Sequence, residues 1–372
     1  MSAISQQFDL SVETNYLQRT MFLDPAGPVS VQRFEEVKYP KLQHYEQVGR
    51  GYFWNPEEVD LTKDKMDFKE ATDAIKHIFT SNLLRQTSLD SSQGKTPALI
   101  FNPAVSIPEL EALCFMWSFF ETNIHSNSYS HIIRNIYGVP KDEFNKIHHN
   151  SHIVNMAASI GRYYTALHRL NCKKELAEEF GLQIDAYEHK RAVYMALHAS
   201  YALEAIRFMV SFATSLAMVE NRIFVGNGNI ISLILQDEIL HKEFTAYIIN
   251  TLEKDDPDFK QIKQECQHEV YQLYIDAIRE EKDWAKFLFS KGPVIGLNEQ
   301  IMCDYVDLTA YESLREIGIV YREPYPKTNP APWMKKHTEL NKKQPALQET
   351  ESTDYVVGLV SDVIHLDELP TI

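Results

Sequence analysis

Glycine and cysteine are scarce in this chain, with 13 glycines and four cysteines among 372 residues. Few glycines, together with long uninterrupted periodic stretches, favour an all-helical protein. The cysteines are far apart and form no CxxC pair; they are Cys114, Cys172, Cys266 and Cys303. This spacing predicts reduced thiols in the core of a cytoplasmic protein and argues against a disulfide framework.

Positive charge is also scarce, since 37 lysines and arginines stand against 52 aspartates and glutamates, giving a formal net charge of −15. A chain this acidic repels phosphate backbones, so we expect no nucleic-acid partner. It also lacks a glycine-rich phosphate loop. No apolar run approaches the roughly 20 residues of a membrane span, and the N-terminus has no basic-then-apolar signal pattern. We therefore expect a soluble cytoplasmic protein without membrane contact.

The helical patterns divide the chain into three parts. Residues 1–65 are expected to form an irregular arm with a first helix at 41–50, residues 66–322 a helical domain, and residues 323–372 a flexible tail. Within the domain the patterns predict helices over 67–93, 106–137, from about 155, 184–220, 230–252, 258–290 and 294–318. Ser106 and Glu109 fit a capping box. Gly226 and Gly228 are expected to break the helix before 230–252.

Carboxylates and histidines recur in an order that suits a metal site between helices. Glu238 and His241 are three residues apart, so they lie about 60° apart around a helix and can face one ion. Glu204 stands in an otherwise apolar helix, where a buried carboxylate is costly unless it is paired or bound to a metal. The candidate ligands are Asp90, Glu121, His125, Glu204, Glu238 and His241. Two carboxylate–histidine helices, each joined by one more carboxylate, can enclose two iron-sized ions.

Each of these residues taken singly has an ordinary explanation. A lone Glu-x-x-His pair is common on solvated helices, and Asp90 alone could cap a helix or accept a hydrogen bond. The order of all six within apolar helices favours the metal site. Mostly oxygen ligands, with one histidine for each ion, suit iron or manganese and disfavour copper. We therefore expect two iron ions, with manganese as the alternative.

A tyrosine follows His125 after one helical turn. Tyr129 is therefore expected close to the ions, where a buried phenol can give up one electron to an oxidising centre. Phe208, Phe212 and Ile234 are expected to wall a dry pocket that keeps water from the oxidised ring. The alternative is an ordinary core tyrosine with a hydrogen-bonded hydroxyl, which would hold if no metal site surrounded it.

Six segments spread along the chain form a highly specific combination: FWNPEEVD at 53–60, LDSSQG at 89–94, SIPELE at 106–111, HSNSYSHIIRN at 125–135, ALEAIRF at 202–208 and DEILH at 237–241. Together they resemble the small, radical-generating subunit of class I ribonucleotide reductase, from about residue 20 into the tail. The resemblance implies a ferritin-like helical bundle with extra helices, a dimetal site and a stable tyrosyl radical. It also implies a homodimer that serves a separate large subunit, where ribonucleoside diphosphates are reduced to deoxyribonucleotides.

The resemblance assigns roles to single residues. It identifies five metal ligands, namely Asp90, His125, Glu204, Glu238 and His241. It identifies Tyr129 as the radical tyrosine, and Trp54 and Asp237 match residues that relay the radical outward. Tyr355 matches the tail tyrosine that passes the radical to the large subunit. The acidic and apolar segment Leu366–Ile372 is the implied docking peptide for that subunit.

The first ligand helix departs from the family pattern Glu-x-x-His-Ser-x-x-Tyr. Thr122 stands three residues before His125 and Glu121 stands four before it, so this helix holds one extra residue. In a regular α-helix the extra step changes the angle between the two side chains by about 100°. Either Glu121 points away, which would leave one ion weakly held or alter the metal preference, or the extra residue forms a π-bulge. We favour the bulge, which keeps Glu121 as a ligand.

Two other functions share this ligand pattern. A ferritin-like iron-storage or oxidase protein needs neither Trp54 nor a tail tyrosine. A dimetal monooxygenase or desaturase would have an open substrate cavity instead of a sealed tyrosine pocket. The set of Trp54, Tyr129 and Tyr355 favours the reductase subunit, an oxidoreductase that works only with its large subunit.

Overall fold

The computed structural model describes residues 10, 14–294 and 296–338. These residues form the helices α1 (Pro40–Gly51), α2 (Thr62–Glu70), α3 (Asp73–Gln93), α4 (Pro108–Phe119), α5 (Ser126–Ile136), α6 (Pro140–Asn145), α7 (Ser151–Phe180), α8 (Ala186–Ala202), α9 (Met209–Glu220), α10 (Val225–Asp255), α11 (Asp258–Leu288) and α12 (Glu299–Glu316). Among the described residues, strand pairing is limited to two isolated bridges. The expected all-α class is therefore confirmed.

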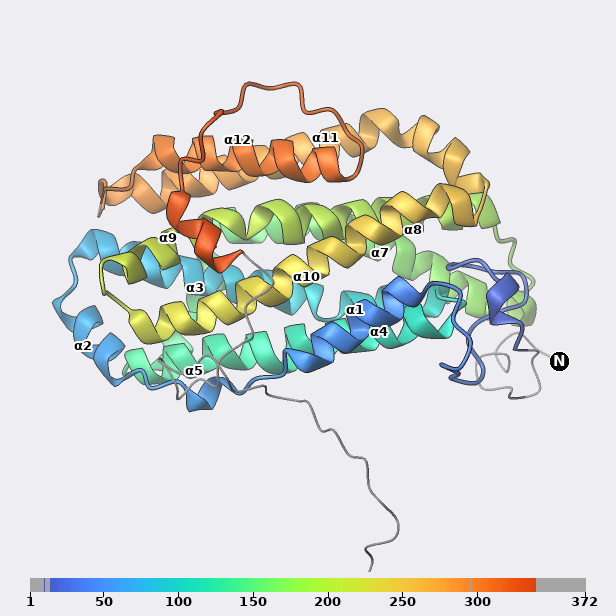
Figure 1. The fold of residues 1–372 in the computed structure, drawn as a ribbon, viewed down its shortest axis with the longest axis horizontal. Helices are drawn as coiled ribbons and strands as arrows, with labels where there is room; N and C mark the ends of the chain where they lie inside the picture. The colour runs from blue at the N-terminus through green and yellow to red at the C-terminus, as the bar shows by residue number, and fades with distance from the viewer. Residues whose placement is uncertain (1–9, 11–13, 295, 339–372) are drawn as a thin grey trace, which may run out of the picture.

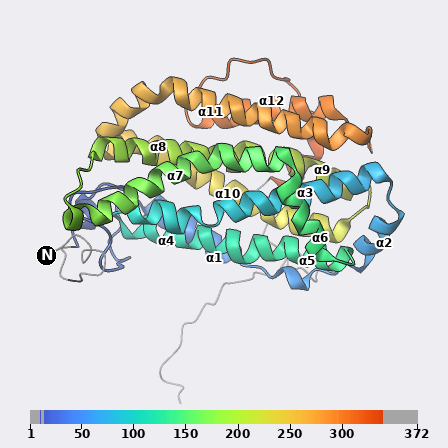
Figure 2. The same ribbon diagram turned by 180° about the vertical axis from the view of Figure 1, so that it is seen from behind.

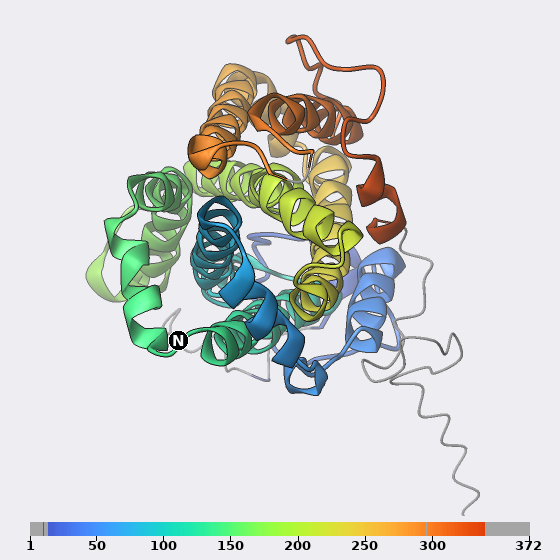
Figure 3. The same ribbon diagram turned by 90° about the vertical axis from the view of Figure 1, so that its left-hand side faces the viewer.

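The long helices lie side by side along one direction (Figure 1). Helix α3 runs through the middle and is enclosed by α5, α7, α9 and α10 when the molecule is viewed along the bundle (Figure 3). Helix α7 packs against α3 and α8 on the rear side (Figure 2), and α1 packs on α4. Helices α11 and α12 form an outer layer over α8 and α9. The center of this bundle is where the candidate ligands lie.

Three π-helical turns occur among the described residues: Pro97–Phe101, which lies between α3 and α4, Phe120–His125 and Leu203–Arg207. The second joins α4 to α5, so the expected helix 106–137 is continuous but carries a π-turn. This confirms the predicted π-bulge between Glu121 and His125. The third π-turn joins α8 to α9 within the expected helix 184–220, and the sequence pattern did not reveal it.

The expectation that Gly226 and Gly228 break a helix is wrong, because both lie within α10. A Cβ atom on Gly228 would come within 1.9 Å of Val219 Cγ2, and one on Gly226 within 2.6 Å of the Asp60 carbonyl oxygen. These glycines therefore permit close packing of α10 against its neighbours. The chain reverses earlier, where Arg222 and Phe224 adopt positive φ angles of 61° and 55°.

The capping box at Ser106 and Glu109 is also absent, since the N-cap of α4 is Ile107 and it makes no side-chain cap bond. The Ser106 hydroxyl instead accepts a hydrogen bond from the Asp24 amide at 3.0 Å, and Glu109 accepts one from the Tyr39 amide at 2.9 Å. Both side chains thus attach the N-terminal arm to the bundle. Contacts this far apart in sequence leave no local signal.

Three helix boundaries differ from the sequence pattern because polar caps override it. The expected helix 67–93 is two helices, and Thr72 caps the second by accepting from the Ile75 amide. Asn150 starts α7 ahead of the expected residue 155. Asn298 starts α12, whereas Val294 and Leu297 ahead of it pair with each other in an isolated bridge.

The segment Ala186–Glu220 is long and apolar enough to cross a membrane by length and composition, which the sequence analysis did not anticipate. However, 94% of its apolar window is buried inside the fold, as expected for a core helix.

Part of the expected flexible tail packs on the bundle. A 3₁₀-helix spans Pro332–His337, Met334 is buried, and the Trp333 indole donates to the Ala213 carbonyl of α9 at 2.9 Å. Tyr355 and Leu366–Ile372 lie outside the described residues. The proposed division of the chain at residues 65 and 322 stays a prediction.

Candidate metal centre

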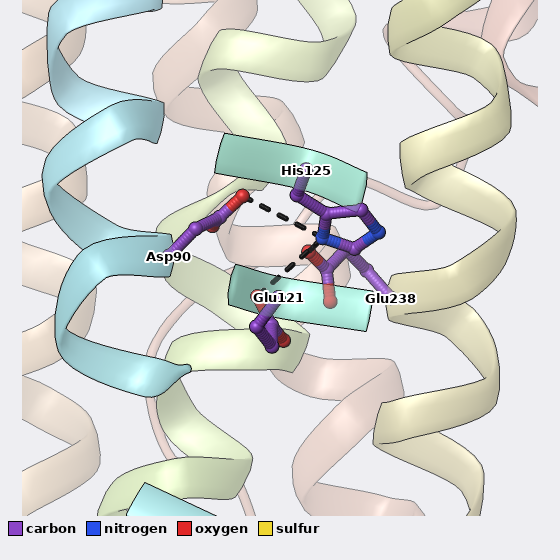
Figure 4. Close-up of side chains that lie close together, drawn as sticks. All are labelled: Asp90, Glu121, His125 and Glu238. Atoms are coloured by element: carbon purple, nitrogen blue, oxygen red, sulfur yellow. Dashed lines mark ion pairs between the residues drawn. The ribbon is translucent and has the colours of Figure 1, made fainter. Parts of the chain in front are cut away.

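The six candidate ligands come together in the middle of the bundle. Four elements supply them, namely α3, the two π-turns Phe120–His125 and Leu203–Arg207, and α10. Figure 4 shows Asp90, Glu121, His125 and Glu238 pointing toward one another from three of these elements. Each of the six side chains is at most 1% exposed. The residues picked from the sequence therefore form one buried cluster.

The cluster divides into two groups of possible metal ligands. Asp90 and His125 belong to one group, Glu204 and His241 belong to the other, and Glu121 and Glu238 belong to both. Within each group the ligand atoms lie within 4.8 Å of one another. Two carboxylates shared between two groups are what a pair of bridged ions requires.

Each shared carboxylate presents one oxygen to each histidine. Glu121 places Oε2 at 3.4 Å from His125 Nδ1 and Oε1 at 3.1 Å from His241 Nδ1. Glu238 places Oε1 at 3.3 Å from His125 Nδ1 and Oε2 at 2.7 Å from His241 Nδ1. Glu121 is thus in the position of a bridging ligand despite its four-residue spacing from His125.

The π-turn at Phe120–His125 makes this position possible. A π-turn spreads one extra residue over the helix and weakens the regular backbone ladder. Polar side chains add bonds to carbonyls in and beside the turn. Thr122 Oγ1 donates to the Ser118 carbonyl at 2.6 Å, and Ser126 Oγ donates to the Glu121 carbonyl at 2.9 Å. The side chains of Thr122 and Asn123 stay exposed while Glu121 and His125 face inward.

Several buried oxygen and nitrogen atoms of the cluster make no hydrogen bond. They are both carboxylate oxygens of Asp90 and of Glu204, Oε2 of Glu121, Oε1 of Glu238 and Nδ1 of His125. Buried polar groups are normally paired, and an unpaired one is costly. Four carboxylates and one histidine with unpaired atoms, beside the second histidine His241, form in this dry interior a donor set that fits hard divalent cations. The buried carboxylate–histidine cluster therefore fits a dimetal site.

The charge state of the cluster reflects its burial. Burial raises the pKa of Asp90 to about 6, and the nearby Glu121 carboxylate adds to the shift. Burial and the neighbouring carboxylates raise the pKa of Glu204 and of Glu238 well above the ordinary glutamate value. For Glu121 burial acts in the same direction, but the adjacent rings of His125 and His241 outweigh it and lower the pKa to about 2. Of the four carboxylates, Glu121 is therefore the one whose pKa is lowered, and it stays readily ionised.

His125 connects the cluster to Trp54 through a single carboxylate oxygen. The ring Nε2 lies 3.1 Å from Asp237 Oδ2, and because an ionised carboxylate only accepts, Nε2 donates. The Trp54 indole donates to the same oxygen at 3.0 Å. Trp54 and Asp237 are 6% and 2% exposed, so this chain of hydrogen bonds is shielded from water. It leaves Nδ1 of His125 facing the carboxylates of the cluster.

Tyr129 lies one turn beyond His125 on α5 and is completely buried, without a hydrogen-bond partner for its hydroxyl. Burial and the carboxylates of Asp90 and Glu238 raise the pKa of this phenol well above 10. The three side chains expected around it, Phe208, Phe212 and Ile234, are also completely buried, and the two phenylalanine rings stack at 5.2 Å.

Two contacts at this centre were missed from the sequence. The buried Trp117 indole donates to Glu121 Oε1 at 3.1 Å, and their four-residue spacing on one helix face could have indicated it. A buried ion pair between Arg85 and Glu281 lies beside the Leu203–Arg207 turn. Its partners are 196 residues apart, so no local pattern could reveal it.

Comparison with known proteins agrees with this centre. The family model of the ribonucleotide reductase small chain matches residues 32–330. The chain belongs to this family. It is 40% identical over 366 residues to the ribonucleoside-diphosphate reductase subunit beta of Buchnera aphidicola from Schizaphis graminum, with 96% of each chain covered. It is 36% identical over 334 residues to the subunit beta of Enterobacteria phage T4, with 84% of this chain and 85% of the relative covered.

Solved structures of small-chain proteins share the fold. The ribonucleotide reductase R2 subunit from Clostridium botulinum aligns with a TM-score of 0.73 at 20% identity and covers 86% of this chain and 94% of its own. The Streptococcus sanguinis dimanganese(II)-NrdF aligns with a TM-score of 0.67 at 19% identity, covering 83% and 99%. The expected ferritin-like fold is thereby confirmed.

Proposed function

We propose that this small chain is the radical-generating beta subunit of a class I ribonucleoside-diphosphate reductase. The observation that carries the proposal is the buried pair of ligand groups joined by Glu121 and Glu238, with Tyr129 buried one turn beyond His125. Relatives named as ribonucleoside-diphosphate reductase subunit beta, at up to 40% identity over 96% of the chain, support the substrate class. The beta subunit functions with a large subunit that carries out the reduction of ribonucleotides.

The six buried side chains would hold two metal ions, Asp90 and His125 on one, Glu204 and His241 on the other, and Glu121 and Glu238 on both. We propose iron, which oxygen-rich ligands suit, and manganese remains an alternative because such ligands accept it as well. The solved structure from Streptococcus sanguinis is named as dimanganese(II). When bound, the ions would supply one-electron redox chemistry at the site, with dioxygen as the oxidant.

Tyr129 is proposed to hold the radical. Its pKa is raised, so the phenol keeps its proton until it loses an electron. The completely buried rings of Phe208 and Phe212, together with Ile234, would keep water from the oxidised tyrosine.

The radical is proposed to leave along the hydrogen bonds from His125 through Asp237 to Trp54. Both donors share Asp237 Oδ2, at 3.1 and 3.0 Å, which supports a continuous path. Tyr355 is proposed as the next residue to carry the radical, on its way to the large subunit. Leu366–Ile372 is proposed as the docking peptide for that subunit. The chain is further proposed to act as a homodimer in the cytoplasm.

The test is electron paramagnetic resonance of the full chain loaded with Fe²⁺ and exposed to oxygen. A tyrosyl radical signal is expected, and Tyr129→Phe should abolish it without changing the metal content. A signal that persists in Tyr129→Phe would place the radical on another tyrosine. Absence of any signal with iron and with manganese would overturn the radical assignment while leaving the metal centre to be judged by its stoichiometry.

A further inference from the structure

The π-turn Leu203–Arg207, which carries Glu204, interrupts the regular backbone hydrogen bonds between α8 and α9. Phe208 separates the turn from α9, which begins at Met209. Amides in the first turn of a helix have no acceptor within that helix. Because this junction is completely buried, water cannot satisfy them, so other parts of the protein must.

Two charged side chains from distant helices contact the backbone at this junction. Glu281 of α11 accepts a hydrogen bond from the Val210 amide at 2.9 Å through Oε1. Arg85 of α3 lies 3.4 Å from the Arg207 carbonyl oxygen and donates to it through Nη2. One side chain therefore serves an amide and the other serves a carbonyl, on either side of Phe208.

Arg85 and Glu281 also pair with each other, and both are at most 1% exposed. The Trp284 ring stacks on the guanidinium group of Arg85, whose Cζ lies 4.6 Å from the ring centroid. The Trp284 indole also donates a hydrogen bond to Ser211 Oγ of α9 at 3.2 Å. A planar guanidinium group can stack on a ring and donate in several directions at once. The pair is thus held rigidly between α3, α9 and α11.

A buried ion pair is a poor device for stability alone. Well-packed apolar residues of similar volume often serve as well or better, because they avoid the cost of removing two charges from water. The pair at Arg85 and Glu281 does what an apolar pair could not do, since it satisfies a backbone amide and a backbone carbonyl that the π-turn leaves exposed to the core.

We propose that Arg85 and Glu281 are positioning residues that hold the π-turn Leu203–Arg207 and thereby direct the carboxylate of Glu204 into the metal centre. This inference rests on the proposed function for the role of Glu204, but the support of the backbone by Glu281 does not depend on any metal. Partners of metal ligands commonly change metal affinity by about 10- to 100-fold when they are lost.

The experiment compares two double variants of the full chain, Arg85→Met/Glu281→Leu and Arg85→Met/Glu281→Gln. Both remove the two charges, and only the glutamine keeps an oxygen that can accept from the Val210 amide.

Hydrogen–deuterium exchange of the metal-free protein measures protection at Val210, and titration with Mn²⁺ alone measures binding. In the leucine variant, loss of the bond should speed exchange at Val210 by about 10- to 100-fold. Its affinity for one of two Mn²⁺ ions should fall by about 10- to 100-fold.

The glutamine variant should retain protection at Val210 and bind Mn²⁺ more tightly than the leucine variant, since both have lost the bond from Arg85 to the Arg207 carbonyl and only the leucine variant has also lost the bond at Val210. A role in packing alone predicts that the two variants behave alike, and that result would overturn the proposal. The matched control is Arg191→Met/Glu269→Leu, which removes a half-exposed ion pair between α8 and α11 and should change neither measurement. If the parent chain fails to bind two Mn²⁺ ions, the proposed function fails, while the difference in exchange at Val210 still decides whether Glu281 holds the turn.

Discussion

Burial and a few neighbouring side chains set the pKa of each carboxylate in the metal centre. The pKa of Glu121 is lowered because His125 and His241 outweigh its burial, whereas burial and the neighbouring carboxylates raise the pKa values of Glu204 and Glu238. His125 shows the opposite balance. Burial lowers its pKa, but Glu238, Asp237 and other carboxylates outweigh this and raise it well above 6.5. In the metal-free protein, protons thus neutralise the charge that divalent cations would otherwise balance.

The first prediction concerns the pH dependence of stability in the metal-free protein. The pKa values of Glu204, Glu238 and His125 are raised in the folded state above about 4.5 for glutamate and 6.5 for histidine. The folded state therefore binds more protons than the unfolded state, and their stabilising contribution is lost as pH rises through the folded values. Between pH 6 and 8 the free energy of unfolding should fall by about 1.4 kcal/mol per pH unit for each excess proton.

Denaturant unfolding of chelator-treated protein at pH 6, 7 and 8 provides the measurement. Glu204→Gln should reduce the slope because it removes one of the titrating groups. Glu121, whose lowered pKa makes its contribution full above about 4.5, should add no slope in this range. Stability that is flat or rises with pH would contradict the assigned directions.

Among the elements, one of the two π-turns that supply metal ligands could be predicted from the sequence and the other could not. The turn at Glu121 could be predicted because a four-residue spacing stands where three are needed. The turn at Glu204 left no such trace, since only one ligand comes from that helix. Its support comes from Arg85 and Glu281, which approach from helices far away in sequence.

The periodic apolar pattern predicted where most helices lie. It did not predict where they end or where two helices pack closely, because both depend on tertiary contacts. Gly228 suggested a break but serves the packing of α10 on Val219. Ser106 suggested a cap but binds the Asp24 amide in the N-terminal arm. Residue type was informative in both cases, yet the partner that gives it meaning lies elsewhere in the fold. The ligand set could be predicted because metal chemistry restricts which residues can take part.

The second prediction tests the π-turn at Phe120–His125. Deletion of Asn123 should restore a three-residue spacing and a regular α-helix, because a π-bulge accommodates its extra residue locally. Since the Asn123 side chain is exposed, its loss removes no core contact. The shortened chain should therefore still bind two Mn²⁺ ions, which equilibrium titration would count.

The control for this deletion is the insertion of one alanine after Asn123, which gives a five-residue spacing and turns Glu121 by about another 100°. The insertion should reduce binding to one ion. If the shortened chain also binds only one ion, the prediction is wrong, and a regular α-helix cannot place Glu121 where the π-turn places it.

At the scale of the molecule, four exposed phenylalanines gather around one hollow of the described surface. Phe34, Phe53, Phe115 and Phe119 are 47%, 49%, 55% and 42% exposed and line a groove of about 1040 Å³ beside α1 and α4. Large apolar patches on a folded chain usually mark an interface. This face is the one that we expect a second copy of the chain to cover in the proposed homodimer.

The third prediction is that Phe115→Ser combined with Phe119→Ser shifts the chain toward the monomer. Light scattering coupled to size-exclusion chromatography would measure the mass. Val320→Ser, which changes a single apolar side chain that is 74% exposed in the segment after α12, is the matched control and should leave the mass unchanged. A parent chain that is itself monomeric at micromolar concentration would contradict the dimer.

The fourth prediction concerns the tail. Removal of Leu366–Ile372 should abolish reductase activity with the large subunit, because the proposed docking peptide is lost. The tyrosyl radical should persist, since every proposed ligand and Tyr129 lie within the retained bundle. Competition with the full-length chain for the large subunit gives the direct measurement. Normal competition by the shortened chain would exclude docking through this segment.

The complete burial of all six ligands also bears on how a metal is chosen. With side chains at most 1% exposed, an ion can enter or leave only when the surrounding helices open locally. Once the site closes, slow release retains whichever ion was captured, even where another would bind more tightly at equilibrium. Selection between iron and manganese then becomes a matter of supply at the moment of loading, and release rates into a chelator would show how long that choice persists.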